Sequence, residues 1–401
     1  MKIGKYKFKS ECRFCQSKNL YKFLDLGFMP HAGDFLTRDQ IGKEKYYPLR
    51  IFYCKKCHLV QVLDVPDPKE LFLNYKYAST YSLKNYFEKY AVKLSKLFRK
   101  DDFVIEIGCN DGVLLKPLKK LGAKVLGIDP AGLIKDKSML VENKFFNEKT
   151  SLFISEKYGK ADVVLASNVM AHIDDMQDVL RGIKNILKPN GTFIFEVHYL
   201  PKLIDKMQYD FFYNEHLGYY TLTTLRTFFE KFGFLITKVE MTKIHNGSIR
   251  VYVKNNNVNC KINNSVQKML KYEKQNGFLK LEKYKCFAKE VEKSKINFLN
   301  KINKLRSKDK KLVGYGASGR ANTILNYCGI TPDMIYYIVD ESPLRAGKYT
   351  PKSHIPIKSL EYFKKDGDVK NVILFAGAYK NQIKEKNKEF IKSGGKFILP
   401  F

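Results

Sequence analysis

The chain has 401 residues, 44% of them hydrophobic, and a formal net charge of +31. This length exceeds what one hydrophobic core usually organises, so we expect two or three domains. Its apolar runs are too short to span a membrane, and the basic N-terminus lacks the apolar stretch of a signal peptide. We therefore expect a cytoplasmic protein without a membrane span.

Lysines are distributed along the whole sequence and form no long block. This distribution fits a compositional bias combined with an anionic small substrate. It leaves binding to nucleic acid or to a membrane surface open. The sequence does not fix an oligomeric state, and a monomer is one of the options.

Cysteines are concentrated near the N-terminus, where two Cys-x-x-Cys pairs occur. Each pair resembles a zinc knuckle, in which a turn directs two thiolates at one ion, and two knuckles complete a tetrahedral site. In a cytoplasmic chain this pattern favours metal over disulfides. Such a site usually stabilises a domain too small for its own core, so we expect a structural Zn²⁺ in a domain of residues 1–75. The expected ligands are Cys12, Cys15, Cys54 and Cys57, with His31 and His58 as spare candidates.

Residues 76–257 begin with a tyrosine cluster around Tyr77 and a helix, and then alternate between strand and helix patterns. We expect strands at 103–107, 124–128, 162–166, 192–197, 234–240 and 249–253. We expect helices at 112–121, 176–187, 200–206 and 222–232. This alternation predicts a doubly wound α/β sheet, whose ligands bind outside the carboxyl ends of the strands.

The first of these strands leads into a glycine-rich turn, Val104-Ile-Glu-Ile-Gly-Cys-Asn-Asp-Gly112. Glycines let the backbone approach a ligand closely, and the helix that follows offers free N–H groups. The second strand ends at Asp129, where a carboxylate suits a ribose diol. These features predict an adenosine-type ligand, with an ordinary strand–turn–helix as the alternative. The candidate ligand-binding residues are Glu106, Gly108, Asn110, Gly112 and Asp129, with Asn110 in place of the usual second glycine.

Residues 258–310 have apolar positions at helical spacing and predict one or two connecting helices. Residues 311–401 restart the α/β pattern and predict a C-terminal Rossmann-like domain. Its expected elements are a strand after Lys311, a helix at 320–327, and strands at Met334–Val339 and Asn371–Ala376. The turn Gly314-Tyr-Gly-Ala-Ser-Gly319, with Asp340 downstream, matches a dinucleotide fingerprint. Alone, this match is weak support for NAD.

Two polar clusters are candidates for chemistry. The third strand of the middle domain leads to Asn168 and His172, and a loop before the helix at 222–232 reads Tyr213-Asn-Glu215-His216. Histidine has a pKa near the working pH, so it can take and return a proton. A tyrosine or a second histidine can stabilise an enolate. The alternative is a polar loop that caps the following helix.

Taken in order, these motifs resemble those of the nucleotide-sugar C-methyltransferases, which place a branch methyl on a keto-deoxysugar. The resemblance covers nearly the whole chain. Its elements are Cys12-x-x-Cys15 with Cys54-x-x-Cys57, Glu106-Ile-Gly108-Cys-Asn-Asp-Gly112, Asn168-Val-Met-Ala-His172, Tyr213-Asn-Glu215-His216, Asn246-Gly-Ser-Ile-Arg250 and Tyr349-Thr-Pro-Lys-Ser-His354. The family commonly has His where Asn214 stands and Gly where Asn246 stands.

This resemblance implies a class I S-adenosylmethionine (AdoMet) fold, AdoMet as methyl donor and an NDP-4-keto-deoxyhexose as acceptor. It implies C3 as the methylated position and a place in deoxysugar or surface-polysaccharide biosynthesis. His216 would be the general base, and Glu215 would orient it or bind the sugar. His172 and Tyr213 would hold the enolate or the sugar hydroxyls, and Tyr77 would line the same pocket. Asn168 would join the cofactor site, and the acceptor would contact Tyr219, Ser248, Arg250, Arg345, Lys348, Lys352 and His354.

Three other functions remain alternatives. The closest is an O- or N-methyltransferase acting on the same kind of sugar. A zinc-bearing nucleic-acid methyltransferase would fit the charge. However, the strand end at Asn168 lacks the Asn-Pro-Pro-Tyr type of motif that holds a flipped base, so we expect no nucleic-acid partner. An NAD-dependent oxidoreductase would fit the C-terminal fingerprint.

Overall fold

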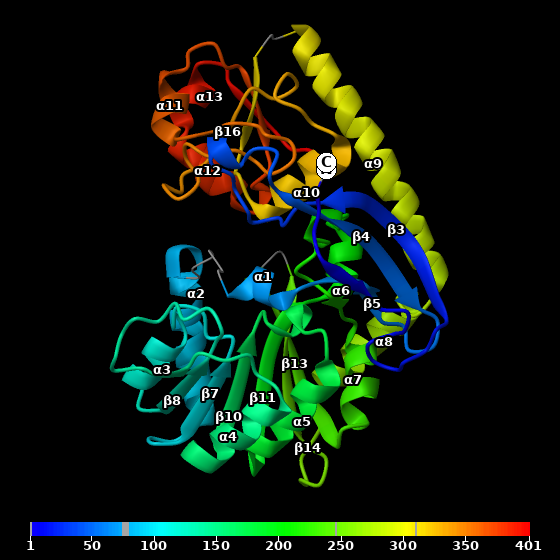
Figure 1. Cartoon of the computed structure of the whole chain (residues 1–401), viewed down its shortest axis with the longest axis vertical. Helices are drawn as coiled ribbons and strands as arrows, with labels where there is room; N and C mark the ends of the chain where they lie inside the picture. Colours follow the sequence, from blue (N-terminus) through cyan, green and yellow to red (C-terminus); the bar gives the residue numbers. More distant parts are fainter. Residues whose placement is uncertain (1, 74–79, 245–246, 309–310) are drawn as a thin grey trace.

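The computed structural model describes residues 2–73, 80–244, 247–308 and 311–401, and it contains three main β-sheets (Figure 1). The C-terminal sheet lies at the top of the view, the N-terminal sheet at the right and the middle domain below. Within the described residues, no helix is both long and apolar enough to cross a membrane.

The middle domain is built on a seven-stranded sheet in the order β13-β14-β11-β10-β7-β8-β9. Its strands are β7 (Phe103–Ile107), β8 (Lys124–Ile128), β9 (Leu140–Glu142), β10 (Ala161–Ser167), β11 (Leu187–His198), β13 (Phe234–Thr242) and β14 (Ser248–Asn255). β14 runs in the direction opposite to that of the other six strands. This order and direction are those of the class I AdoMet-binding sheet that the sequence predicts.

Helices cover both faces of this sheet because its strands are apolar on both sides. Along β7, Ile105 and Ile107 face one cluster of buried side chains while Val104 faces another. One face carries α4 (Glu148–Tyr158), α5 (Met176–Ile186), α7 (Leu222–Glu230) and α8 (Asn264–Gln275). The other carries α2 (Thr80–Leu94) and α3 (Leu115–Lys120).

The N-terminal sheet contains β1 (Lys2–Ile3), β3 (Leu20–Met29), β4 (Lys45–Cys54), β5 (Val60–Val62) and β12 (Gly218–Tyr219). β2 (Tyr6–Phe8) and β6 (Asp64–Pro66) form a separate ribbon, followed by α1 (Pro68–Phe72). β12 comes from the loop after His216, and it pairs antiparallel with β5. The loop with the candidate base is therefore hydrogen-bonded to the N-terminal sheet.

The C-terminal domain has a five-stranded parallel sheet in the order β17-β16-β15-β18-β19. Its strands are β15 (Leu312–Tyr315), β16 (Ile338–Val339), β17 (Ile357–Lys358), β18 (Asn371–Leu374) and β19 (Lys396–Ile398). Its helices are α10 (Gly319–Cys328), α11 (Leu360–Lys365), α12 (Lys380–Lys386) and α13 (Lys388–Lys392). The long helix α9 (Leu281–Lys308) runs beside β3 up to this domain (Figure 1).

One hydrophobic cluster joins all three parts of the molecule. It contains Leu49 and Ile51 of β4, Leu203 of α6 (Leu200–Asp205), Phe298 of α9 and Leu325 of α10. The N-terminal unit, which the sequence predicts as a zinc domain of residues 1–75 too small for a core of its own, thus shares a core with the other two parts.

Several expected boundaries differ in the structure. The helix expected at 112–121 begins only at Leu115, because Gly112 has a φ of 76°, outside the helical region. The strand expected at Met334–Val339 is reduced to its last two residues, since a turn closes on Thr331 before them. β9 and α4 were not predicted. The apolar residues of α4 are adjacent (Leu152-Phe-Ile154), so they give no helical period.

Candidate active site

The turn after β7 has the conformation of a ligand-binding loop. Gly108, Asn110 and Gly112 all have positive φ, at 69°, 51° and 76°. A Cβ on Gly108 would lie 2.2 Å from Cγ2 of Val169, so the next turn along the sheet edge leaves room only for glycine. Two turns at the carboxyl edge of the sheet therefore meet at Gly108.

Asp129 holds this turn together at the end of β8. One carboxylate oxygen accepts the N–H of Asn110 and the other accepts the N–H of Ala131, both at 2.9 Å. Each oxygen retains a second lone pair, to which a ribose hydroxyl can donate.

Two further polar groups face this edge without a hydrogen-bond partner among the described atoms. They are Oε2 of the buried Glu106 and Oδ1 of Asn168. Burial, followed by the charges of Asp129 and Asp111, raises the pKa of Glu106 well above its ordinary value. The two unpartnered acceptors and the glycine turn fit the amine and hydroxyl donors of AdoMet.

Three histidines lie together at the carboxyl edge of the same sheet. His172 follows β10, His198 ends β11, and His216 lies in the loop before β12. The His216 ring centroid is 4.9 Å from that of His172 and 4.2 Å from that of His198. His198 has no predicted role, although the strand end at Glu196–His198 is one of the carboxyl ends where the sequence predicts that ligands bind.

Partners of His216 define which ring nitrogen is basic. Its Nδ1 lies 3.3 Å from the carbonyl oxygen of Phe211, which can only accept, so Nδ1 carries the proton. Its Nε2 lies 2.9 Å from the hydroxyl of Tyr213, which can donate. When the imidazole is neutral, this geometry places an unprotonated Nε2 beside a phenol, the arrangement that a general base requires.

Glu215 faces the N-terminal unit. Its carbonyl oxygen lies 2.7 Å from Nδ1 of His172. Burial raises the pKa of Glu215 to about 7, although the nearby backbone N–H groups of Ala32 and Gly33 lower it, so the carboxyl group can donate or accept a proton near neutrality. Burial also lowers the pKa of His172.

The predicted acceptor residues do not form one cluster. Arg250 is buried, with one guanidinium nitrogen 3.0 Å from both the Glu196 carboxylate and the Tyr86 hydroxyl. The Tyr219 hydroxyl donates to the Phe211 carbonyl at 3.1 Å, and the Ser248 hydroxyl to that of Ile244 at 3.3 Å. The Arg250 guanidinium is therefore already paired with protein groups, and we do not expect it to bind the acceptor.

Two of the predicted acceptor residues in the C-terminal domain, Lys352 and His354, contact the N-terminal unit. Lys352 Nζ donates to the Phe28 carbonyl at 2.7 Å, and His354 Nε2 lies 2.5 Å from the Glu44 carboxylate. The half-buried Arg345 contacts Asp340 at 3.4 Å, and Lys348 lies in the same turn. Tyr77 and Asn246 lie outside the described residues.

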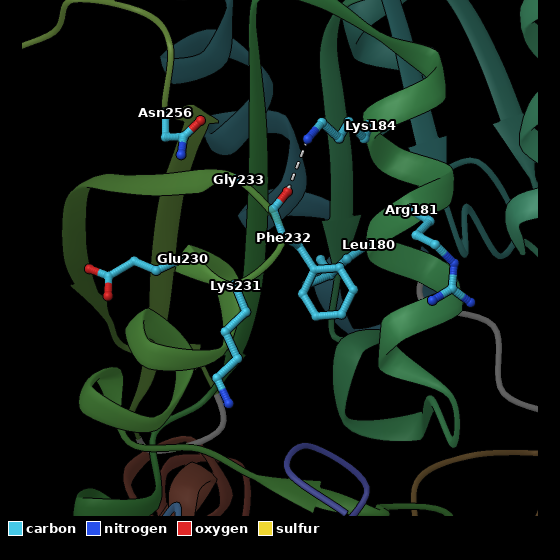
Figure 2. A pocket seen from close by; sticks show the side chains of 8 residues that line it. All are labelled: Leu180, Arg181, Lys184, Glu230, Lys231, Phe232, Gly233 and Asn256. Atoms are coloured by element: carbon cyan, nitrogen blue, oxygen red, sulfur yellow. Dashed lines mark hydrogen bonds between the residues drawn. The ribbon is translucent and has the colours of Figure 1, made fainter.

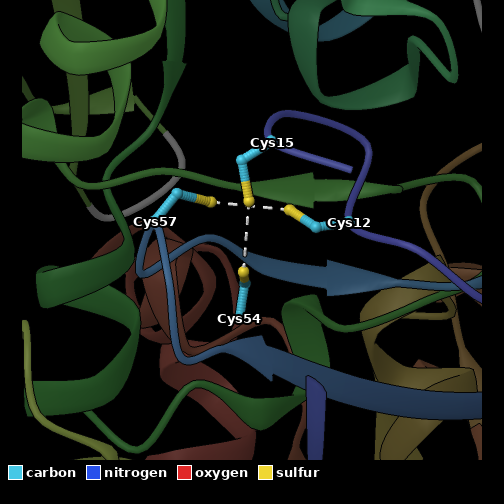
Figure 3. Close-up of side chains that lie close together, drawn as sticks. All are labelled: Cys12, Cys15, Cys54 and Cys57. Atoms are coloured by element: carbon cyan, nitrogen blue, oxygen red, sulfur yellow. Dashed lines mark hydrogen bonds between the residues drawn. The ribbon is translucent and has the colours of Figure 1, made fainter. Parts of the chain in front are cut away.

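Four cysteines meet as predicted at the edge of the N-terminal sheet (Figure 3). All four Sγ atoms lie within 4.8 Å of one another, and the Cys12–Cys57 and Cys15–Cys54 pairs are 3.5 Å apart. Tetrahedral Zn²⁺ with Zn–S bonds of about 2.3 Å needs sulfurs roughly 3.8 Å apart. The site therefore fits Zn²⁺ with its four positions filled by protein, which is the structural type.

A pocket at the opposite end of the middle sheet has no part in this site (Figure 2). It lies where α5 and α7 end and β13 begins, and Lys184 crosses it to the Phe232 carbonyl at 3.4 Å.

Comparisons with known proteins agree with this arrangement. Three families match successive parts of the chain: "Putative zinc binding domain" at residues 12–72, "Methyltransferase domain" at 82–239 and "C-methyltransferase C-terminal domain" at 243–401. The curated C-methyltransferase NovU of Streptomyces niveus is 30% identical over 97% of this chain and 95% of its own length.

Other relatives cover less of the chain. A ubiquinone biosynthesis O-methyltransferase of Bradyrhizobium diazoefficiens is 36% identical over 23% of this chain and 38% of its own. A SAM-dependent methyltransferase of Archaeoglobus fulgidus is similar over 43% of this chain and 94% of its own, with 16% identity and a TM-score of 0.35. Since NovU matches almost from end to end, the chain belongs to the C-methyltransferase family that includes NovU, and it is an AdoMet-dependent methyltransferase with a structural zinc site.

Proposed function

We propose that this enzyme methylates C3 of an NDP-4-keto-deoxysugar through an enolate, as a step in deoxysugar or surface-polysaccharide biosynthesis. The observation that carries the proposal is the contact between His216 Nε2 and the Tyr213 hydroxyl, next to the AdoMet turn. Methylation at carbon requires a base that removes a proton from that carbon. A C–H group next to a ketone is acidic enough for this, because the resulting carbanion is stabilised as an enolate.

Each of these side chains has a role in the proposal. His216 Nε2 takes the proton from the carbon next to the ketone. Tyr213 turns from His216 to the ketone oxygen and donates a hydrogen bond to the developing enolate. Bound AdoMet supplies the electrophilic methyl group. His172 and Glu215 contact sugar hydroxyls, since the Glu215 carboxyl keeps one oxygen without a hydrogen-bond partner among the described atoms.

The nucleotide diphosphate is assigned to the C-terminal domain. Asp340 accepts the N–H groups of Ala317 and Ser342 at 2.8 and 2.9 Å, which repeats the two-sided arrangement at Asp129. Nearby Arg345 and Lys348 supply positive charge for phosphate oxygens. The proposed location is the cytoplasm, where reducing conditions keep the four zinc-binding cysteines as thiolates and prevent disulfide formation.

The experiment is mass spectrometry of the purified enzyme with AdoMet and a panel of NDP-4-keto-deoxysugars that differ in base and sugar. We expect one member to gain one methyl group, and nuclear magnetic resonance of the product to place it at C3. If no member gains a methyl group, the proposed acceptor class is wrong.

A second measurement separates carbon from oxygen methylation. The same substrates are incubated with enzyme and S-adenosylhomocysteine in D₂O. Enolate chemistry predicts deuterium at the carbon next to the ketone without methyl transfer, whereas an O-methyltransferase would leave that position unexchanged.

A further inference from the structure

The segment that leads into the Glu215–His216 pair is packed on the C-terminal domain, although it is inserted in the middle one. This segment begins with a short 3-10 helix, Tyr209–Phe211. The buried Tyr209 ring lies 5.5 Å from the ring of Tyr327 in α10 and 5.3 Å from that of Phe401. The position of the loop is therefore set partly by α10.

Arg320, in the first turn of α10, makes the polar part of this contact. Its Nε donates to Asp210 Oδ2 at 2.8 Å, and a terminal nitrogen lies 2.7 Å from the same oxygen. Its guanidinium carbon lies 4.1 Å from the centre of the Phe211 ring. Because Asp210 is buried, removal of Arg320 would leave a carboxylate without its counter-charge.

Arg320 therefore anchors Asp210 and the ring of Phe211, the residue whose carbonyl faces His216. That carbonyl accepts from His216 Nδ1 at 3.3 Å and from the Tyr219 hydroxyl at 3.1 Å. The acceptor opposite Nδ1 decides which ring nitrogen carries the proton. If the carbonyl turns away, the preference for an unprotonated Nε2 is lost.

We propose that Arg320 is a positioning residue that acts from the C-terminal domain, through Asp210 and Phe211, to hold His216 in the tautomer with a basic Nε2. The proposal rests on the proposed role of His216 as base. It makes the C-terminal domain part of the deprotonation machinery in addition to its binding role.

The test compares Arg320→Gln, Arg320→Lys and a matched control, Lys311→Gln. Lys311 and Asp366 form an ion pair 2.7 Å long in the same domain, with side-chain exposures of 26% and 8%, against 28% and 7% for Arg320 and Asp210. Substrate deuterium exchange in D₂O is measured with dTDP-4-keto-6-deoxyglucose and the other members of the panel.

For Arg320→Gln we expect the maximal exchange rate to fall about 10- to 100-fold with a small change in KM, because the substrate site is intact and the base is misaligned. Arg320→Lys should recover part of the rate, since lysine reaches Asp210 but does not stack on Phe211 in the same way. Lys311→Gln should match the wild type. An Arg320→Gln rate within about twofold of wild type would overturn the proposal, given the size expected for a misplaced base.

A measurement without substrate keeps the two proposals separate. In ¹⁵N-histidine-labelled full-length enzyme, His216 is assigned by its loss in His216→Asn, and its tautomer is read from the two ring-nitrogen shifts. Wild type should show protonated Nδ1, and Arg320→Gln a mixture of tautomers. An unchanged tautomer would refute the positioning role. Absence of exchange in wild type with every substrate would instead refute the proposed function.

Discussion

At the scale of single residues, the proposed role of His216 as general base can be tested most directly. We expect His216→Asn to lower turnover by about 10²- to 10⁴-fold, the usual contribution of a general base. AdoMet binding, measured by calorimetry, should persist, because the cofactor turn is built from β7 and β8. His58→Asn is the control, since His58 contacts Tyr53 in the N-terminal unit. Near-normal turnover in His216→Asn would show that another group removes the proton.

Glu215 predicts a pH dependence of stability. With a pKa near 7 when folded and about 4.3 when unfolded, this carboxyl is protonated more readily in the native state. Between about pH 4 and pH 7, Glu215 binds more protons in the native state than in the unfolded state. Its contribution to the free energy of unfolding therefore falls as the pH rises through this range.

Glu215→Gln mimics the protonated group. The variant should match wild type near pH 4, and near pH 8 it should be more stable by up to about 4 kcal/mol, from about 2.7 pKa units at 1.36 kcal/mol each. Urea unfolding at both pH values measures the difference. An equal effect of the substitution at both values would contradict the raised pKa.

At the scale of elements, the β7 turn can be tested with a matched pair of glycines. Gly108 and Gly329 have φ of 69° and 67°, but a Cβ meets Val169 only at Gly108, and nothing lies within 4 Å at Gly329. Both Ala variants should incur left-handed strain of about 1–2 kcal/mol. Only Gly108→Ala should weaken AdoMet binding, by about tenfold or more, or 1.4 kcal/mol. Calorimetric titration with AdoMet measures the affinity of each variant. Equal affinities in the two variants would contradict the conclusion that the β7 turn has no room for a Cβ at Gly108.

Local sequence signals predicted some elements better than others. The strands at 103–107 and 124–128 match β7 and β8, because buried parallel strands are short apolar runs bounded by polar residues and glycine. β12 could not be predicted, since its two residues become a strand only by pairing with β5. α4 does carry a local helix signal, since its N-cap Asn147 accepts the N–H of Thr150, but its adjacent apolar residues obscure the helical period.

At the scale of the whole molecule, the zinc site stabilises more than its own loops. Phe14, between the first two ligands, stacks 3.7 Å from Phe228 of α7. We expect Cys12→Ser to reduce zinc from one ion per chain and to lower the melting temperature of one common transition by about 5 °C or more. The exposed Cys286→Ser is the control. Elemental analysis and calorimetry measure both effects, and a separate early transition would indicate an independent N-terminal domain.

Much of the site could be predicted because its residues belong to short motifs at strand ends, as with Gly108, Asp129 and the four cysteines. What could not be predicted is long-range. The contact of Ala32 with Glu215 joins different domains, and so does that of Arg320 with Asp210. Neither hydrophobic periodicity nor motif spacing predicts such contacts. The burial of Arg250 against Glu196 likewise depends on the register between β11 and β14.

The pairing of β12 with β5 has a consequence for the order in which the chain folds during synthesis. The N-terminal sheet is translated first, but its last strand, Gly218–Tyr219, follows five strands of the AdoMet-binding sheet, β7 to β11. An emerging N-terminal segment therefore cannot complete its sheet on the ribosome until most of the middle domain has been made. Truncated nascent chains that stop before residue 218 should expose the β5 edge, and this edge is where chaperone binding or misassembly would begin.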